Sequence, residues 1–364
     1  MKRSFIREIL EYIDSDTISF AGGLPDVSLF PLDELQKAAQ RVLENADSLQ
    51  YGHSTGYAPL KEQIAKYYRD RGFPTVAENI LITSGSQQGL DIICRYYSGT
   101  SIAIEKPSYL GALNIFRLNN LNRFDMPLSQ DGIDSDLFRK SILQTKLAYL
   151  IPDFQNPSAT CYTDKNRKEI ARAIRDSQIV LIEDSPYSEL YFDMPHNSIS
   201  QLVPEQSYHL GSFSKMLAPS LRVGWIRADK ALLSPLIAYK EAMDLHTSGI
   251  SQRIISEYLK DGKSFRKHLQ KLRTSYRKKM NFFCEKLDLY LPDFEYTRPR
   301  GGMFIYGKLK GVDTVKLAKI CLGKGVVFVP GAEFNGASDE IRFNFTNSSF
   351  EEISEGLKRI KSSL

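Results

Sequence analysis

Short apolar runs that alternate with helical segments are the feature that most constrains the fold of this chain. Strands are expected from about Asn79 onward, at residues 80–83, 102–104, 148–151, 179–182 and 222–226. Segments with helical spacing lie between most of these runs, as at 87–97 and 164–175. The alternation favours an α/β domain with a mainly parallel sheet. Ligands of such sheets bind off the carboxyl ends of the strands.

The pattern changes after about Ala238, where long basic helices extend to about Leu289. Strands at 303–306, 326–329 and 341–345 follow, with helices near 314–322 and 350–361. A chain of 364 residues is too long for one ordinary hydrophobic core. We therefore predict a large α/β domain and a smaller α+β domain.

Composition and charge exclude several classes of protein. The net charge of +5 is small for this length, and the densest basic run, 263–279, carries apolar residues at helical spacing. That spacing favours a solvated helix face over a nucleic-acid-binding stripe. The four cysteines share no metal-ligand spacing, so we expect buried reduced thiols and no metal site: Cys94, Cys161, Cys284 and Cys321.

The first twenty residues are rich in charge, and no apolar run reaches the roughly 20 residues that span a bilayer. A signal peptide needs an apolar core, which these residues do not provide. We therefore expect a cytoplasmic protein with neither a membrane nor a nucleic acid as its partner.

One lysine stands apart from the charged helix faces. Lys215 has Ser-Phe-Ser before it and Met-Leu-Ala-Pro after it, so it has no helical partner face. A lysine in a half-apolar setting loses its proton easily and can act as an amine nucleophile or form a Schiff base. Ser212 and Arg222 lie close enough in sequence to hold a phosphate beside it. A buried structural lysine or a loop charge is the alternative.

Four other features fall at or near strand ends. The turn at 83–89 leads from a strand into a helix and offers free N–H groups and hydroxyls to an anion. Asn156 stands before a proline, and Asp184, with Tyr187, closes a strand. Arg342 interrupts a strand of alternating pattern, where it could grip a carboxylate if it faces a cleft. Taken singly, each also has an ordinary structural explanation as a turn, a cap or a solvated charge.

One cofactor, pyridoxal 5′-phosphate, accounts for all five features together. It needs a lysine for its aldehyde, an acid for its ring nitrogen, donors for its phenolic oxygen, an anion cradle and a stacked aromatic ring. Its amino-acid substrates need an arginine for the α-carboxylate.

These residues stand in motifs that resemble the pyridoxal-phosphate aminotransferases of fold type I, class I/II, and within them the 2-aminoadipate and kynurenine aminotransferases. The motifs span nearly the whole chain in order: Ser-Phe-Ala-Gly-Gly-Leu-Pro, Leu-Gln-Tyr-Gly, Thr-Ser-Gly-Ser-Gln-Gln, Glu-Lys-Pro-Ser-Tyr, Pro-Asp-Phe-Gln-Asn-Pro, Glu-Asp-Ser-Pro-Tyr, Gly-Ser-Phe-Ser-Lys, Pro-Arg-Gly-Gly-Met-Phe and Ile-Arg-Phe-Asn-Phe.

The resemblance implies a large domain with a mainly parallel seven-stranded sheet flanked by helices, plus a smaller α+β domain. It places the large cofactor-binding domain at residues 46–262 and the small domain at 263–364. Residues 1–45 would form an N-terminal arm and helix that pack with the small domain and the substrate site.

The resemblance also implies a role for each candidate residue. Lys215 would be the Schiff-base lysine and the proton shuttle, and Asp184 would keep the ring nitrogen protonated. Tyr187 and Asn156 would bind the phenolic oxygen. Tyr109 would stack on the ring, although an ordinary core tyrosine is the alternative there. The phosphate would be held by Gly85, Ser86, Gln87, Ser212 and Arg222, with a minor role for Ser214.

Two further implications concern the neighbouring subunit and the substrate. Tyr51 resembles a tyrosine that reaches the phosphate of the neighbouring subunit, which implies a homodimer with shared active sites. Arg342, Asn156 and Gly23 would face the substrate. Arg7, in an expected helix over residues 4–13, would meet the distal carboxylate of a dicarboxylic amino acid. A solvated charge on an exposed helix is the alternative for Arg7.

We therefore expect an aminotransferase that moves an amino group from an L-amino acid to a 2-oxo acid, with 2-oxoglutarate as the expected acceptor, in a ping-pong mechanism. Another pyridoxal-phosphate reaction, such as a β-lyase or a decarboxylase, is an alternative because a fold does not determine the bond that is broken. A non-catalytic ligand-sensing regulator is a second alternative. Against it stands the expectation that no DNA-binding segment precedes the first helix.

Overall fold

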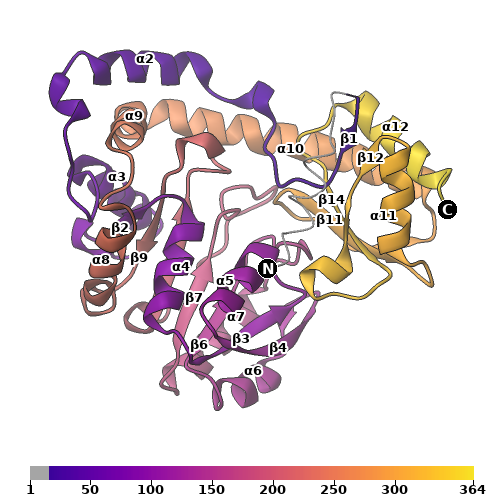
Figure 1. Cartoon of the computed structure of the whole chain (residues 1–364), viewed down its shortest axis with the longest axis horizontal. Coiled ribbons are helices and arrows are strands. Elements are labelled where there is room, and N and C mark those ends of the chain that lie inside the picture. The colour runs from indigo at the N-terminus through magenta and orange to yellow at the C-terminus, as the bar shows by residue number, and fades with distance from the viewer. Residues whose placement is uncertain (1–15) are drawn as a thin grey trace.

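The computed structural model describes residues 16–364 and is organised around two sheets (Figure 1). The larger sheet has eight strands in the order β2-β9-β8-β7-β6-β3-β4-β5. Their bounds are β2 (Ile80–Thr83), β3 (Ser101–Lys106), β4 (Asn122–Ser129), β5 (Gly132–Ile133), β6 (Leu147–Leu150), β7 (Val180–Asp184), β8 (Ser207–Ser212) and β9 (Gly224–Arg227).

Most strands of this sheet point the same way. β8, β7, β6, β3 and β4 pair in parallel, whereas β9 runs antiparallel to β2 and β8, and β5 runs antiparallel to β4. The sheet therefore has eight strands and not the expected seven, because the two-residue β5 folds back on the end of β4. The mainly parallel α/β architecture expected from the sequence is confirmed.

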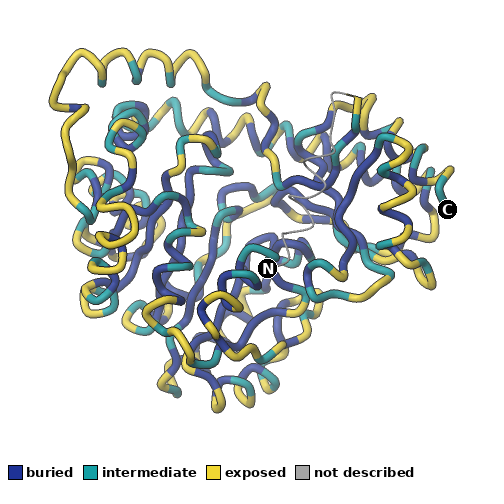
Figure 2. The backbone as a smooth tube through the Cα atoms, viewed as in Figure 1, coloured by how far each residue is buried: buried dark blue, intermediate teal, exposed yellow. Residues whose placement is uncertain are grey.

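The central strands are buried on both faces, which explains their almost continuous apolar runs (Figure 2). Ile102 and Tyr149 belong to the core that includes residues of α4 (Ser86–Tyr96) and α5 (Leu110–Leu118). Their neighbours Ala103 and Ala148 face the second core, with α6 (Ser135–Ile142) and α7 (Asp164–Arg175). This alternation across the sheet follows from the two-residue period of a strand.

The sequence-based expectation lacked three strands of this sheet, namely the two-residue β5 and the longer strands β4 and β8. β4 mixes polar and apolar residues and is mostly exposed, because it lies near the edge of the sheet. β8 is buried at all six positions, yet its sequence, Ser-Tyr-His-Leu-Gly-Ser, contains no apolar run. Neither β4 nor β8 carries the pattern by which the others were found.

The helices that the sequence predicts are present within the described residues. Those at 164–175 and 350–361 match in both bounds, since Thr163 caps the first and Ser349 with Glu352 forms a capping box on the second. The helix at 350–361 is α12 (Phe350–Lys361), and the α-helices not yet given are α2 (Leu32–Leu43), α3 (Ala58–Arg69), α8 (Lys230–Asp244), α9 (Gly249–Leu259), α10 (Lys263–Tyr290) and α11 (Thr314–Gly323).

The smaller sheet is antiparallel and lies at the other end of the molecule, beside α10, α11 and α12 (Figure 1). Its order is β10-β11-β14-β13, from β10 (Phe294–Tyr296), β11 (Phe304–Leu309), β14 (Glu340–Asn344) and β13 (Val329–Pro330). The N-terminal β1 (Ile18–Ser19) pairs in parallel with β12 (Val326–Val327). The segment before α2 is thus attached to the small domain, whereas α2 itself packs on α9.

The 28-residue α10 runs from beside α9 to the small sheet, a length of about 42 Å at 1.5 Å per residue. One helix therefore links both bodies, and the domain boundaries expected at residues 45 and 262 stay predictions. The four cysteines are buried and free, as expected. Within residues 16–364, no helix is long and apolar enough to cross a membrane.

Phe343 in β14 is the centre of an aromatic cluster in the small sheet. Its ring centroid lies 5.5 Å from that of Phe294, 5.6 Å from Phe283 and 5.7 Å from Phe328. Because side chains alternate along a strand, burying Phe343 on this side turns its neighbour Arg342 to the opposite face.

Removing the Phe343 ring should destabilise the protein strongly. We expect Phe343→Ala to lower the free energy of unfolding by about 3–5 kcal/mol, because a buried cavity replaces the ring. Urea denaturation provides the measurement, and Leu143→Ala is the control, since Leu143 is 83% exposed. The control should change stability by no more than about 0.5 kcal/mol. Equal effects of the two substitutions would show that the aromatic cluster adds nothing.

Candidate active site

A pocket of about 150 Å³ opens at the carboxyl ends of the parallel strands. β2, β3, β6, β7 and β8 each deliver lining residues at or just beyond their last position. The lining includes Gly85, Ser86, Gln87, Tyr109, Asn156, Asp184, Tyr187, Ser212, Ser214, Lys215 and Arg222. The structure thus brings together residues that are up to 137 positions apart in the sequence (85 to 222).

Lys215 lies three residues beyond the end of β8 and is partly buried. Its Nζ donates a hydrogen bond of 2.7 Å to the carbonyl oxygen of Gly23. Burial lowers the pKa of Lys215 to about 8, and the positive charges of Arg342 and Arg222 act in the same direction. The amine therefore gives up its proton much more easily than a surface lysine does.

Asp184, the last residue of β7, presents one carboxylate oxygen to the pocket. Its Oδ2 accepts a hydrogen bond of 2.8 Å from the Tyr149 hydroxyl. Its Oδ1 is buried and has no hydrogen-bond partner among residues 16–364. Burial raises the pKa of Asp184 to about 6, although the Tyr149 hydrogen bond opposes that shift. Such an oxygen suits a charged N–H donor of a ligand, for example a protonated ring nitrogen.

The turn between β2 and α4 has the form of an anion cradle. Gly85 caps α4 with φ +86°, and a Cβ at this position would lie 2.5 Å from Nη2 of Arg222. Ser86 begins the helix, whose first N–H groups have no acceptor within the helix. The Arg222 guanidinium donates to the Ser84 carbonyl at 3.0 Å and so stays beside this turn. Backbone N–H groups and a cation together suit a phosphate.

Arg342 is only 2% exposed and lies behind Asn156. It donates to Asn156 Oδ1 at 2.8 Å and to the Ala21 carbonyl, and Asn156 Nδ2 in turn lies 3.4 Å from the Tyr187 hydroxyl. The Arg342 Nε is buried and has no hydrogen-bond partner in the described part of the chain. Burial lowers the pKa of Arg342 to about 10. A buried guanidinium with a spare donor is suited to a carboxylate.

Two aromatic candidates differ in their position. Tyr109 lines the pocket at the start of α5, and its ring folds over Gly111, where a Cβ would lie 2.5 Å from Tyr109 Cζ. Tyr51 is 78% exposed and does not line the pocket, and its ring contacts that of His246. Arg7 lies outside the described residues.

Tyr149 is the site residue that the sequence analysis missed. It looks like any aromatic residue of a buried strand, and its importance comes only from the pairing of β6 with β7. The useful signal would have been register, since Tyr149 pairs with Ile182, two positions before Asp184 and on the same face of the sheet.

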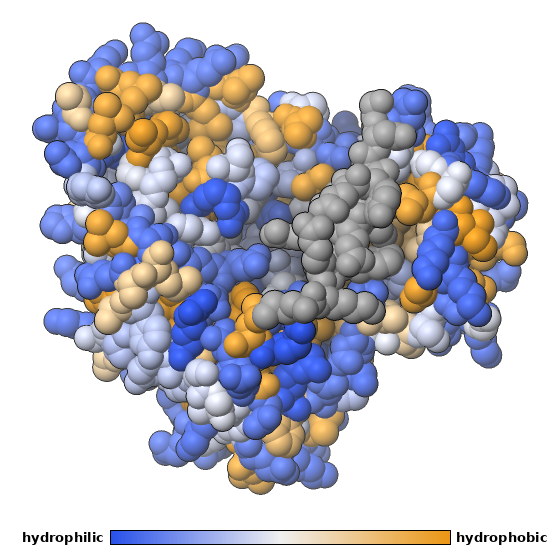
Figure 3. All heavy atoms as spheres, in the orientation of Figure 1, coloured by the Kyte–Doolittle hydropathy of each residue, from blue (hydrophilic) through white to orange (hydrophobic). Residues whose placement is uncertain are grey.

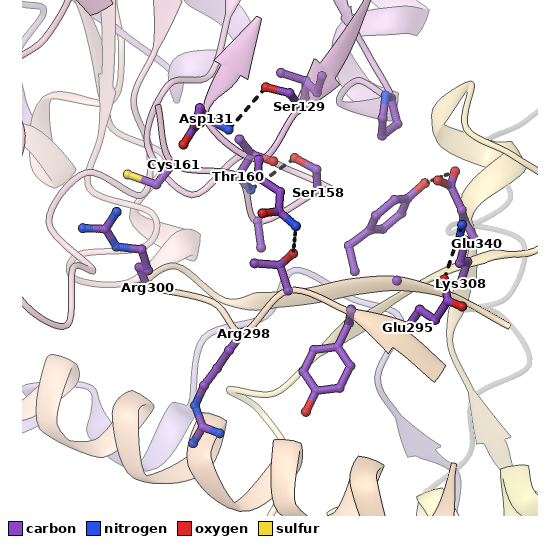
Figure 4. Close-up of a pocket in the computed structure, with 18 of the residues that line it drawn as sticks. Ser129, Asp131, Ser158, Thr160, Cys161, Glu295, Arg298, Arg300, Lys308 and Glu340 are labelled. Carbon is purple, nitrogen blue, oxygen red and sulfur yellow. Dashed lines mark hydrogen bonds and ion pairs between the residues drawn. The ribbon is translucent and has the colours of Figure 1, made fainter. Parts of the chain in front are cut away.

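A larger cleft of about 570 Å³ lies between the β4–β5 hairpin, the segment after Asn156 and the small sheet (Figure 4). Figure 4 shows Ser158 and Thr160 on one side and Arg298 on the other. None of the predicted site residues within 16–364 lines this cleft. Most of the predicted site residues line the smaller pocket instead.

Comparison with known proteins agrees with this geometry. The family model for aminotransferase class I and II matches residues 15–360, and the chain belongs to that family. It is 36% identical to aromatic-amino-acid aminotransferase 1 of Thermococcus litoralis, over 99% of this chain and 91% of that protein.

Two solved structures are similar over the full chain. LysN, the α-aminoadipate aminotransferase of Thermus thermophilus, was solved with N-(5′-phosphopyridoxyl)-L-leucine. It has a TM-score of 0.92 and 35% identity, covering 100% of this chain and 95% of that one. The kynurenine aminotransferase of Pyrococcus horikoshii has a TM-score of 0.93 and 32% identity, with 100% and 94% covered. The predicted family, fold type and pyridoxal-phosphate-dependent transamination are confirmed.

The pocket fits this cofactor on its own chemistry. It offers the Lys215 amine, whose pKa is lowered, and the Asp184 Oδ1, which has no hydrogen-bond partner among residues 16–364. It also offers the turn at Gly85, where a Cβ would fill the space. These are the three features that the aldehyde, the ring nitrogen and the phosphate require.

Replacing Asp184 by asparagine should stabilise the cofactor-free protein at pH 8. The folded pKa of about 6 exceeds the unfolded value near 3.8, so ionisation of the buried carboxyl destabilises the fold progressively between those two pH values. Above pH 6 that loss amounts to about 3 kcal/mol. We expect Asp184→Asn to recover part of it at pH 8 and nothing below pH 4, measured by urea unfolding of the cofactor-free protein.

Asp153→Asn is the control, because Asp153 forms a buried ion pair with Arg167 at 2.6 Å. Breaking such a pair leaves a buried cation unpaired and should destabilise by about 3–5 kcal/mol. An Asp184→Asn protein that is no more stable than wild type at pH 8 would contradict the assignment of Asp184 as a buried carboxylate whose ionisation destabilises the fold.

Proposed function

We propose that this aminotransferase moves the amino group of an L-amino acid to 2-oxoglutarate, with 2-aminoadipate, glutamate and aromatic amino acids as the candidate donors. The observation that carries the proposal is the convergence of Lys215 and Asp184 on one pocket, which Arg342 does not line but contacts through Asn156 Oδ1 at 2.8 Å. The names of the similar proteins, which include aromatic-amino-acid, α-aminoadipate and kynurenine aminotransferases, support this choice of donors.

Each side chain has a distinct task in this proposal. Pyridoxal phosphate, when bound, supplies an aldehyde and an electron-withdrawing ring. Asp184 Oδ1 would accept a hydrogen bond from the protonated ring nitrogen, and Asn156 and Tyr187 would hold the phenolic oxygen. Tyr109 covers the ring. The phosphate is held by the cradle residues Gly85, Ser86, Gln87, Ser212 and Arg222.

Lys215 acts as the base and the acid of the reaction. With a pKa of about 8, its amine could take the proton from the substrate Cα and deliver it to the carbon that was the cofactor aldehyde, without a large energetic penalty. Gly23 supports it by accepting its hydrogen bond, and Arg342 orients the substrate by its α-carboxylate. The Arg342 Nε, which has no hydrogen-bond partner in the described part of the chain, would be the donor for that carboxylate.

We also propose a homodimer with shared active sites, in which Tyr51 serves the phosphate of the other copy. Its exposure of 78% supports this role, because in its own subunit Tyr51 does not line the pocket. Exposed apolar residues accompany it, and Figure 3 shows apolar side chains at the surface over α2. They include Leu32 (61%), Leu43 (56%) and Leu49 (65%). The cytoplasm remains our expected location.

Lys215 should be the lysine that binds the cofactor covalently. Borohydride reduction of the holoenzyme followed by peptide mapping should find the cofactor on the Lys215 peptide. It should be absent from the peptide of Lys279, a buried lysine already paired with Asp26 at 2.8 Å. Lys215→Ala should lower kcat by at least about 100-fold, because the proton-transferring group is gone. A Lys215→Ala protein that still traps the cofactor covalently, or that keeps a normal kcat, would contradict the assignment of Lys215 as the cofactor-binding lysine.

Arg7 tests the choice of donor. If it meets a distal carboxylate, Arg7→Ala should lower kcat/KM for 2-aminoadipate by about 10-fold or more, since a charge-assisted hydrogen bond is lost. The kcat/KM for leucine should change less than about twofold. Steady-state assays with 2-oxoglutarate as acceptor provide both numbers, and Lys2→Ala is a control for general loss of charge. Equal losses on both donors would remove Arg7 from substrate selection.

A further inference from the structure

The Tyr149 side chain donates a hydrogen bond to Asp184, and its position affects how Asp184 can contact the cofactor. We propose that Tyr149 is a positioning residue, which holds Asp184 so that Oδ1 faces the pocket and can accept a hydrogen bond from the protonated ring nitrogen of the cofactor. This inference rests on the role assigned to Asp184 in the proposed function. It adds a residue that does not itself line the pocket.

The register of the sheet brings the two side chains together. Tyr149 in β6 pairs with Ile182 in β7, and Asp184 lies two residues farther along the same strand. Residues two apart in a strand share a face, and a tyrosine is long enough to reach the diagonal neighbour on the next strand. Its hydroxyl meets Asp184 Oδ2 at 2.8 Å.

This hydrogen bond determines which carboxylate oxygen is available. The carboxylate of Asp184 has two equivalent oxygens, and Tyr149 occupies one of them while the other stays unpaired among the described residues. The Tyr149 ring cannot swing away, because it is fully buried and packs edge-on against Phe116 at 5.3 Å between ring centroids. The Tyr149 hydroxyl is therefore already in place as a donor to Asp184 before any ligand binds.

The same bond favours the ionised form of Asp184. Burial raises its pKa, and the Tyr149 hydroxyl opposes that rise. Burial and the adjacent carboxylates of Asp184 and Glu105 raise the pKa of Tyr149 well above its usual range, so its hydroxyl stays protonated. Glu105 on β3 and Tyr187 beyond β7 are the other titratable groups that interact with Asp184. Neither donates a hydrogen bond to its carboxylate in the described structure.

The chain offers a matched control in Tyr162. This tyrosine is also fully buried, and its hydroxyl donates at 2.8 Å to the buried carboxylate of Glu105. Glu105 accepts two further hydrogen bonds, from the Ile151 backbone and from Gln155 Nε2, and does not line the pocket. Tyr162→Phe therefore removes an equivalent hydroxyl that donates to Glu105 and not to Asp184.

The experiment compares Tyr149→Phe and Tyr162→Phe with wild type by equilibrium binding of pyridoxal phosphate across pH, with kcat and KM measured separately. A hydrogen bond to a charged group corresponds to roughly 10- to 100-fold in an equilibrium constant. We expect Tyr149→Phe to raise the cofactor dissociation constant by at least about 10-fold. Its affinity should also begin to fall at a higher pH than in wild type as the solution is acidified, because Asp184 now protonates more readily.

In Tyr149→Phe, kcat should fall while KM for the amino donor stays within about twofold, because the donor does not contact Tyr149. Tyr162→Phe should leave cofactor affinity and its pH dependence within about twofold of wild type. A Tyr149→Phe protein with wild-type affinity and pH dependence would overturn the proposal. Equal shifts in both variants would also overturn it, since they would indicate a merely structural role.

A second form of the test keeps the ring and the fold. Incorporating 3-fluorotyrosine at position 149 makes the hydroxyl a stronger donor, so the acid limb of cofactor binding should move to lower pH. A shift in the opposite direction, or none, would count against the proposal even if Tyr149→Phe fails to fold. Asp184→Asn separates this inference from the proposed function. If that variant binds the cofactor as tightly as wild type, the role of Asp184 itself is wrong.

Discussion

The parallel pairing of β6, β7 and β8 is the constraint on which the rest of the molecule depends. Parallel strands end at the same edge of the sheet, so the residues that follow each strand meet there although the sequence separates them widely. Asp184 closes β7, Ser212 closes β8, and Lys215 follows within three residues. The helices on both faces bury this sheet.

Polar groups at this edge of the sheet are buried, but not all of them have a hydrogen-bond partner, and this combination suits them to bind a ligand. An interior normally satisfies its polar groups, and exceptions need an explanation. Here Asp184 Oδ1 and Arg342 Nε are both buried and unpaired within the described residues, and the amine of Lys215 donates to a backbone carbonyl, not to a carboxylate. The fold thus keeps hydrogen-bonding capacity in reserve for groups that arrive with the cofactor and the substrate. The cofactor-free protein is correspondingly less stable than its core alone would allow.

Much of this architecture could be read from the sequence, for identifiable reasons. The apolar strands β2, β3, β6 and β7 are buried on both faces, and capped helices such as α7 carry their own end signals. The lysine, the acid and the cradle were found because they are polar residues at strand ends. β8 was missed because its buried residues are not an apolar run. Tyr149 was missed because its partner is set by register between strands, which a single sequence does not display.

The hydrogen bond between Lys215 and Gly23 has a mechanical consequence. Lys215 belongs to the large domain, whereas Gly23 follows β1, which is joined to the small domain through β12. Asn344 and Thr346 hold the same segment from the small-sheet side through the carbonyls of Gly22 and Leu24. The Lys215 Nζ therefore also joins the large domain to the segment that is attached to the small domain. When Nζ bonds to another group, this hydrogen bond is lost, and we expect the two domains to be joined less rigidly.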